Sequence, residues 1–298
     1  MTSGNILASW QEYDITVLRT FVPVDGQDGF GNDYTEDDNC VALWRFESDA
    51  FYIDTKGNND LMSYGDSFPL LYRPPVLDSV TYKEGSSSAY FEPHLTYPPA
   101  PSQLSLQGMR ISNADLDAGF PLKNGDTTKI FSICFWARPY TFGQLLGGNQ
   151  FAEEWYQKGR SIKSQLRIGA YSNDAGPVYS NWQMALSLAS ADGSGFNTVY
   201  CHDSLLSTER WYFIAVTYEV GAYRIRVWDD TAQAILGVDK TGVAIDVFVP
   251  PIEYSSDFST LYIGDSFVSI DGHMDNVVVF KDILTVEEID KIRTGDYP

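Results

Sequence analysis

The segment 211–230, WYFIAVTYEVGAYRIRVWDD, constrains the fold more than any other stretch, because it has the pattern of two β-strands joined by a tight turn. Residues 211–218 are aromatic, β-branched or small and carry no charge, so both faces of this strand are expected to be covered. Gly221 can adopt a positive φ and permits the turn. The return strand at 223–227 alternates apolar residues with arginines, which predicts one buried face and one solvated face.

Other stretches repeat the strand pattern and are separated by turn residues. Each is short, and most are rich in β-branched or aromatic side chains. We expect strands at 40–46, 88–91, 109–111, 130–137, 184–188, 197–201, 244–249, 261–263 and 274–280. So many short strands predict an all-β sandwich or barrel.

One helix is expected, at the C-terminal end of the sequence. Thr285 and Glu288 form a T-x-x-E capping box, and Leu284 and Ile289 have the spacing of a hydrophobic staple. Gly295 supplies the residue at which such a helix ends.

Residues 1–38 differ from the rest and are interpreted as an N-terminal arm before a domain at 39–298. The arm fits a helical or an extended pattern, and we favour a strand at 14–22. The Gly- and Asp-rich stretch 25–39 lacks the DxDxDG spacing of a calcium hand and is interpreted as a linker. The arm could hold the protein to a neighbouring copy.

The charge balance narrows the function classes. Forty acidic residues against 20 basic ones give a net charge of −20, which argues against nucleic acids and anionic membrane surfaces as partners. No apolar run reaches the roughly 18 residues of a membrane span, so no membrane insertion is expected. The start has no basic segment followed by an apolar one, so no signal peptide is expected.

The three cysteines, Cys40, Cys134 and Cys201, cannot all pair with one another, and no CxxC spacing occurs. Cys40 and Cys134 lie in apolar runs, where buried free thiols are expected.

Four segments in sequence order resemble laminin-G-like domains of the concanavalin A-like lectin/glucanase superfamily. They are CVALWRFESDAFYIDTKGNNDL, IFSICFWARP, RWYFIAVTYEVGAYRIRVWDD and LYIGDSFVSIDGHMDNVVVFKDILTVEEIDKI. The resemblance spans residues 39–296 and leaves 1–38 and the insertions at 62–105 and 140–182 without a counterpart. It implies an antiparallel two-sheet jelly-roll β-sandwich with a short C-terminal helix.

The resemblance also implies a structural Ca²⁺ where the loop after the first strand meets the last strand. Such an ion takes about six to eight oxygen ligands. The ligands available here are Asp54, the Gly57 carbonyl, Asn59 or Asp60, and Asp275. An Asp beside a Gly-Asn turn can instead cap that turn.

Catalytic carboxylates are not evident in the sequence, and we predict that the protein is not an enzyme. The Glu-x-Asp-x-Glu strand of glucanases, which places three acids on one face, is absent. The nearest pattern is 271–275, DGHMD, which lacks a Glu, whereas Glu153 and Glu154 are adjacent and would face opposite sides. No GxSxG or GxGxxG motif occurs.

Aromatic residues concentrate in the loop-rich middle of the chain, where they could stack on sugar rings beside amide and carboxylate side chains. The candidate ligand-binding residues are Trp155, Tyr156, Tyr171, Tyr179 and Trp182. Alternatively, these rings pack the loops onto the sandwich.

We expect a non-enzymatic binding or structural module. The favoured role is an adhesion, decoration or assembly subunit, displayed on a virion, filament or cell surface, that contacts protein partners or glycans. The alternative is a dedicated carbohydrate-binding lectin, and a glycoside hydrolase is a weaker third interpretation.

Overall fold

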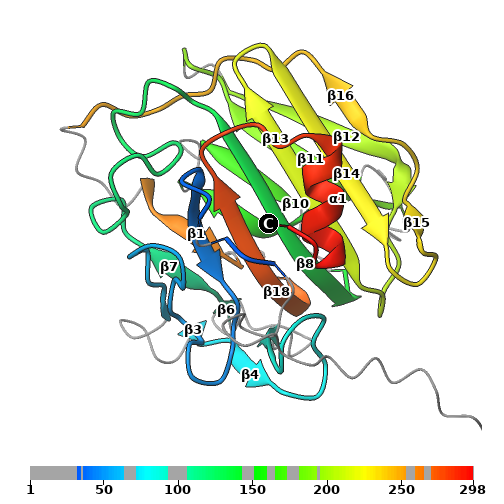
Figure 1. Ribbon diagram of the computed structural model, residues 1–298. Helices are drawn as coiled ribbons and strands as arrows, with labels where there is room; N and C mark the ends of the chain where they lie inside the picture. Colours follow the sequence, from blue (N-terminus) through cyan, green and yellow to red (C-terminus); the bar gives the residue numbers. More distant parts are fainter. Residues whose placement is uncertain are drawn as a thin grey trace, which may run out of the picture.

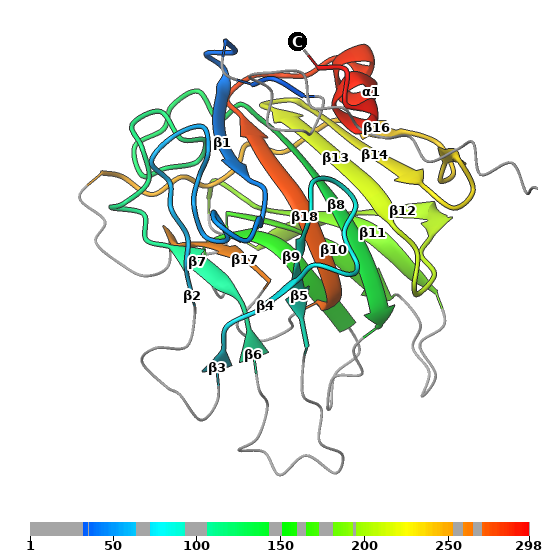
Figure 2. The same ribbon diagram turned by 60° about the horizontal axis from the view of Figure 1, so that its bottom comes forward.

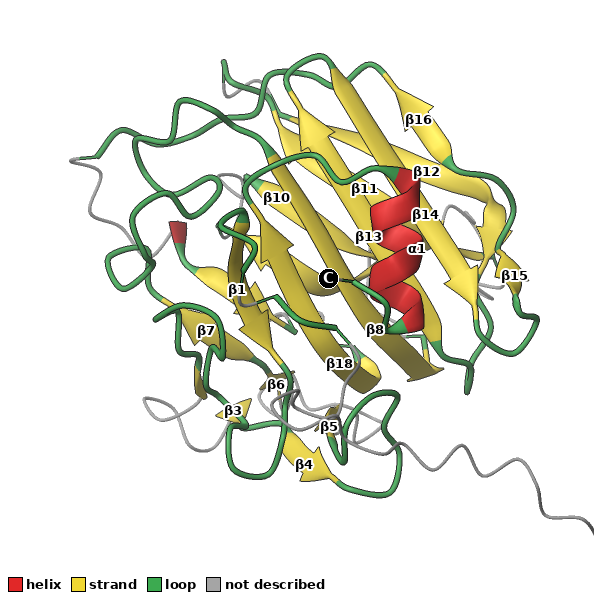
Figure 3. Cartoon of the chain, in the orientation of Figure 1, coloured by secondary structure: helices red, strands yellow, loops and turns green. Residues whose placement is uncertain are grey.

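The chain forms a β-sandwich of two antiparallel sheets packed face to face, with one short helix on an outer face (Figures 1 and 2). Strands account for nearly all of the regular structure (Figure 3). The structure, a computed structural model, describes residues 32–34, 36–63, 72–92, 106–142, 151–159, 165–172, 181–192, 195–252, 259–264 and 270–297. The predicted all-β sandwich is confirmed, and the strand predicted at 14–22 lies outside the described residues.

One sheet has nine strands and carries the helix. Its path runs through β15 (Ala234–Ile235), β14 (Ala222–Asp229), β13 (Tyr212–Glu219), β8 (Phe131–Thr141), β18 (Asp271–Phe280), β5 (Ser88–Phe91) and β4 (Val76–Asp78). Two further strands join at its sides, β1 (Cys40–Trp44) on β18 and β16 (Lys240–Gly242) on β14.

The second sheet has seven strands. Its order is β12 (Phe196–Leu205), β11 (Trp182–Ala189), β10 (Leu166–Ser172), β9 (Phe151–Lys158), β17 (Leu261–Ile263), β7 (Met109–Ile111) and β2 (Met62–Ser63). A separate parallel pair is formed by β3 (Tyr72–Arg73) and β6 (Leu106–Gln107).

The predicted hairpin is the pair β13–β14, which turns at Gly221 with φ 94°. Because side chains alternate along β13, Tyr212 and Ile214 enter the core between the sheets, and Phe213 faces the helix side. Both faces of β13 are therefore covered, as its uncharged sequence predicts.

One predicted strand is shorter than expected and another is absent as a strand. The first strand ends at Trp44, because Phe46 has a φ of 57°, outside the range of an extended chain. Residues 244–249 make only an isolated bridge, between Ser190 and Val247, and within this segment Ala244 and Val247 are buried whereas Asp246 is exposed.

Helix α1 (Val286–Thr294) has the predicted caps. The Thr285 side chain accepts from the Glu288 N–H at 3.2 Å, and Gly295 ends the helix in the left-handed conformation. Ile289 and Ile292 are buried against the nine-stranded sheet. No described helix is long and apolar enough to cross a membrane.

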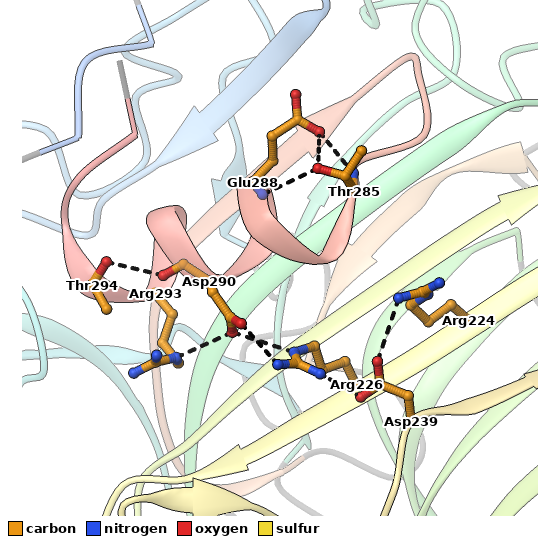
Figure 4. A network of polar contacts seen from close by, with 8 residues as sticks. All are labelled: Arg224, Arg226, Asp239, Thr285, Glu288, Asp290, Arg293 and Thr294. Carbon is orange, nitrogen blue, oxygen red and sulfur yellow. Dashed lines mark hydrogen bonds and ion pairs between the residues drawn. The ribbon is translucent and has the colours of Figure 1, made fainter.

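Charged groups also hold the helix to the sheet (Figure 4). Arg226, on β14, bonds to Asp290 of the helix at 2.8 Å and to Asp239 at 2.7 Å. Its guanidinium donates to two carboxylates at once, which fixes the helix against the strand.

The described part of the predicted arm packs against the same helix. Asn32 Nδ2 donates to the carbonyl of Ile292 at 2.8 Å, and the Tyr34 ring stacks on Tyr297 at 5.4 Å between centroids. Tyr34 also contacts Phe280 edge to face. Residues 32–34 therefore pack as part of the sandwich.

Replacing Tyr34 with Ala should remove this buried ring and lower the free energy of unfolding by about 3 kcal/mol. Urea denaturation measures the change. Glu36→Ala, at an exposed position two residues away, is the control and should stay close to wild type. Equal stability of Tyr34→Ala and wild type would show that this segment does not support the fold.

Lys158 is a charged residue inside the sandwich, 1% exposed. Its Nζ donates to the Ser259 carbonyl and to Asn113 Oδ1. Burial, with a smaller contribution from Lys123, lowers the pKa of Lys158 to about 7.

This lowered pKa predicts a pH dependence of stability. Between about pH 7 and the ordinary lysine pKa of 10.5 the unfolded chain keeps a proton that the folded chain has lost, so stability due to Lys158 rises with pH. From pH 7 to pH 9, the free energy of unfolding of wild type should rise by on the order of 2 kcal/mol more than that of Lys158→Met. Denaturant titrations at both pH values measure this change, and Lys240→Met is the surface control. If wild type and Lys158→Met differ by the same amount at both pH values, the expectation is wrong.

Candidate functional site

The turn after β1 is built around the carboxylate of Asp54, which is 4% exposed. Its Oδ1 accepts from the main-chain N–H groups of Leu43 at 2.8 Å and Lys56 at 3.0 Å. Its Oδ2 accepts from the main chain and the side-chain amide of Asn59 at 3.1 and 2.8 Å. Four donors therefore surround this carboxylate.

Asp117 completes the turn and was not identified from the sequence. Asn59 Nδ2 donates to its Oδ2 at 3.2 Å, and its own N–H donates to Asn59 Oδ1 at 2.8 Å. A Cβ on Gly57 would lie 2.8 Å from the carboxylates of both Asp54 and Asp117, so the close approach requires glycine. Asp60 accepts from the Asp54 N–H at 2.9 Å.

Asp275, the remaining predicted calcium ligand, makes its hydrogen bonds outside the Asp54 turn. Its Oδ2 accepts from the N–H groups of Lys83 and Glu84 at 2.8 and 2.9 Å, and its buried Oδ1 has no hydrogen-bond partner. Burial raises the pKa of Asp275 well above its usual value. The structure therefore brings Asp54, Gly57 and Asn59 together and gives Asp275 other partners.

These contacts bear on whether the predicted residues fit Ca²⁺. The ion binds oxygen lone pairs, whereas both Asp54 oxygens already accept N–H donors. The Asp54 turn therefore fits a hydrogen-bonded cap better than a calcium ligand set. Within the described residues, no three His, Cys, Asp or Glu side chains are arranged to hold a metal. Calcium binding stays a prediction.

Glu84 is enclosed beside Asp275. Trp136 Nε1 donates to its Oε1 at 2.8 Å and Asn276 Nδ2 to its Oε2 at 2.5 Å. Burial raises the pKa of Glu84 to about 7, although these donors oppose the shift. The contacts of the two carboxyl groups attach residues 83–84 to β18 and β8.

Asp54→Asn should lower the free energy of unfolding by about 2–4 kcal/mol, because an amide group would replace one oxygen that accepts two N–H bonds. The loss should appear equally in calcium and in a calcium chelator. The same melts test the metal, since a bound ion raises the melting temperature of wild type by mass action. A loss confined to calcium would instead assign Asp54 to a metal site.

The structure corrects the predicted aromatic surface. Trp155 and Tyr156 are buried in the core, and Trp182 is 4% exposed and stacks on Phe142 at 4.9 Å. These three rings offer no face to a sugar, because they point between the sheets or are covered by another ring. Tyr179 lies outside the described residues.

Tyr171 lies on the other side of its strand. Ile168 and Ala170 of β10 face the core, so Arg167 and Tyr171 face outward, as does Gln183 of β11. Polar and aromatic side chains of four adjacent strands share this outer surface, here called the polar face: Glu154, Arg167, Tyr171, Gln183, Ser187, Thr198 and Tyr200.

Side-chain contacts organise the polar face. Arg167 pairs with Glu154 at 2.8 Å and lies over the Phe196 ring at 4.6 Å. Tyr171 meets Tyr200 edge to face at 6.2 Å between centroids. The face is closed toward β9, where Glu154 is 4% exposed, and opens toward β12, where Phe196 is 37% exposed.

The polar face combines ring faces with hydroxyl groups, a guanidinium and a carboxylate. Glu154, Tyr171, Gln183 and Ser187 are each 9% exposed or less, so the side chains that reach a sugar are Arg167, Phe196 and Tyr200 on the open side of the face. Only Tyr171 of the polar face was identified from the sequence. The alternation of polar and apolar residues in LRIGAYS and WQMALSLA is the signal that could have identified Arg167 and Gln183.

No family model and no curated protein sequence matches the chain. The fold is similar to domain 4 of AbnA, a GH43 extracellular arabinanase from Geobacillus stearothermophilus solved in complex with arabinotriose. The TM-score is 0.52 at 11% identity, over 85% of this chain and 98% of that chain.

Two phage proteins also have similar structures. The enzymatically active domain of bacteriophage CBA120 tailspike protein 2 has a TM-score of 0.44 at 14% identity, over 76% of this chain and 31% of that chain. The CBM2 module of the evolved Dit of Lactobacillus casei BL23 phage J-1 has a TM-score of 0.37 at 11% identity, over 83% and 97%. At 11% identity the likeness to the arabinanase domain shows a shared β-sandwich fold.

Proposed function

We propose that the protein is a non-catalytic glycan-binding module displayed on the surface of a virion, filament or cell. The observation that carries the proposal is the open side of the polar face, where the half-buried Tyr200 meets Tyr171 and Arg167 lies over the exposed Phe196 ring. Glycan recognition needs ring faces for C–H stacking and paired hydrogen-bonding groups for hydroxyls, and this surface has both.

The fold supports the same function. The sandwich is similar to a domain that was solved with arabinotriose. The sequence resemblance to laminin-G-like domains agrees with a binding module on a surface. The non-catalytic part of the proposal is supported by the pairing of Glu154, the carboxylate of this face, with Arg167.

A glycan array that includes arabino-oligosaccharides tests the proposal. Tyr200→Ala should weaken binding of the recognised glycan roughly tenfold, because a stacking ring is removed from the open side of the face. Tyr82→Ala, an exposed tyrosine of the loop between β4 and β5, is the matched control and should bind as wild type does. Equal binding by both variants would exclude the polar face.

Hydrolysis is measured on the same glycans. We expect no turnover by wild type. Turnover that is abolished by Glu154→Gln would overturn the non-catalytic assignment.

Assembly is the second candidate function. Residues 32–34 are attached to α1 and β18, so the preceding chain meets the sandwich beside the helix. A segment leaving a folded domain there could contact a neighbouring copy. Light scattering of the full chain and of a chain lacking residues 1–31 should give a larger assembly for the full chain; equal sizes would remove this role.

A further inference from the structure

A second group of aromatic side chains lies on the outer face of the nine-stranded sheet and was not singled out from the sequence. This end cluster consists of Tyr90 on β5, Arg138 and Tyr140 on β8, His273 on β18 and Trp211 just before β13. All except His273 are half-buried, so their outer surfaces reach solvent. Since the two sheets pack face to face, the end cluster and the polar face lie on opposite sides of the sandwich.

His273 organises the rings. Its imidazole is 1% exposed and stacks on Tyr90 at 4.7 Å between centroids. Tyr140 meets it edge to face at 5.2 Å, and Trp211 lies 6.2 Å away. His273 Nε2 bonds to Asp78 at 2.8 Å, and its buried Nδ1 has no hydrogen-bond partner. Three half-buried rings are therefore held around a fixed imidazole.

Arg138 adds a fixed donor. Its guanidinium lies 5.0 Å from the Tyr140 ring centroid and donates to the Tyr140 hydroxyl at 2.9 Å. Its Nε donates to the carbonyl of Glu209 at 3.2 Å. Glu209 has a φ of 63°, which is unfavourable for a residue with a side chain. The neighbouring segment thus keeps a strained backbone at the place where it contacts Arg138.

The charges around the cluster limit the ligand. Asp78 and Asp271 lie close to Tyr90, and burial together with Asp271 and Glu92 raises the pKa of its hydroxyl. Arg138 carries one positive charge in the cluster against the three carboxylates of Asp78, Asp271 and Glu92, and this negative balance disfavours uronic acids, sialic acids and phosphates. Rings with hydroxyl and guanidinium donors beside carboxylate acceptors suit a neutral, hydroxyl-rich molecule.

We propose that the end cluster is a second binding site, for an uncharged saccharide that stacks on Trp211 or Tyr90 and takes hydrogen bonds from Arg138. The module then has two glycan sites on opposite faces and can join two glycan chains. Binding at two sites on one body raises the overall affinity for a surface that carries many glycans.

Fluorine NMR of protein labelled with fluorotryptophan tests the site directly. The Trp211 signal is assigned from its loss in Trp211→Phe. Titration with arabinotriose, cellotriose and N-acetylchitotriose should shift this signal for at least one of them, and trigalacturonate should not. Tyr90→Ala removes a half-buried ring and should weaken that binding roughly tenfold. An unchanged melting temperature of this variant is the folding check.

The control separates the two sites. Tyr200→Ala, on the opposite face, should leave the Trp211 titration unchanged, so the end cluster is tested whether or not the polar face binds glycans. The proposal is overturned by any of three results: no shift with the neutral trisaccharides, an equal shift with trigalacturonate, or a titration that Tyr90→Ala does not alter.

Discussion

The pairing of β8 with β18 is the interaction on which the rest of the structure depends. It joins Ser132 to Phe280 and Thr141 to Asp271, so segments more than 100 residues apart form the middle of one sheet. One face of this pair supplies the core between the sheets, and the other supports α1, the residues around Asp275 and the end cluster. Such distant pairing closes large loops and is typical of slow-folding β proteins.

The features that the sequence predicts are those set by neighbouring residues. The β13–β14 hairpin follows from one turn glycine and an uncharged strand, and the helix follows from Thr285, Glu288 and Gly295. The sequence predicts Trp155 and Trp182 as ligand contacts, whereas both are buried, because their burial depends on the direction in which β9 and β11 face a second sheet. Local spacing does not fix that direction without the register of both strands.

The candidate sites show the same limit. Asp54 and Asn59 were identified because they lie in one short turn, whereas Asp117 comes from a loop 58 residues further along the chain. The polar face and the end cluster each collect side chains from several strands, and no motif marks them. Period-two alternation indicates which residues share a face, but the order of strands in the sheets decides which of those residues become neighbours.

The three cysteines have a practical consequence. Cys40, Cys134 and Cys201 are all buried, and burial raises the pKa values of Cys40 and Cys134. Thiolates are the reactive species, and a raised pKa keeps a thiol protonated. Because the three thiols are also buried, an alkylating reagent reaches them only after the sandwich opens. Alkylation followed by mass spectrometry would therefore time the opening of the native protein through its own cysteines.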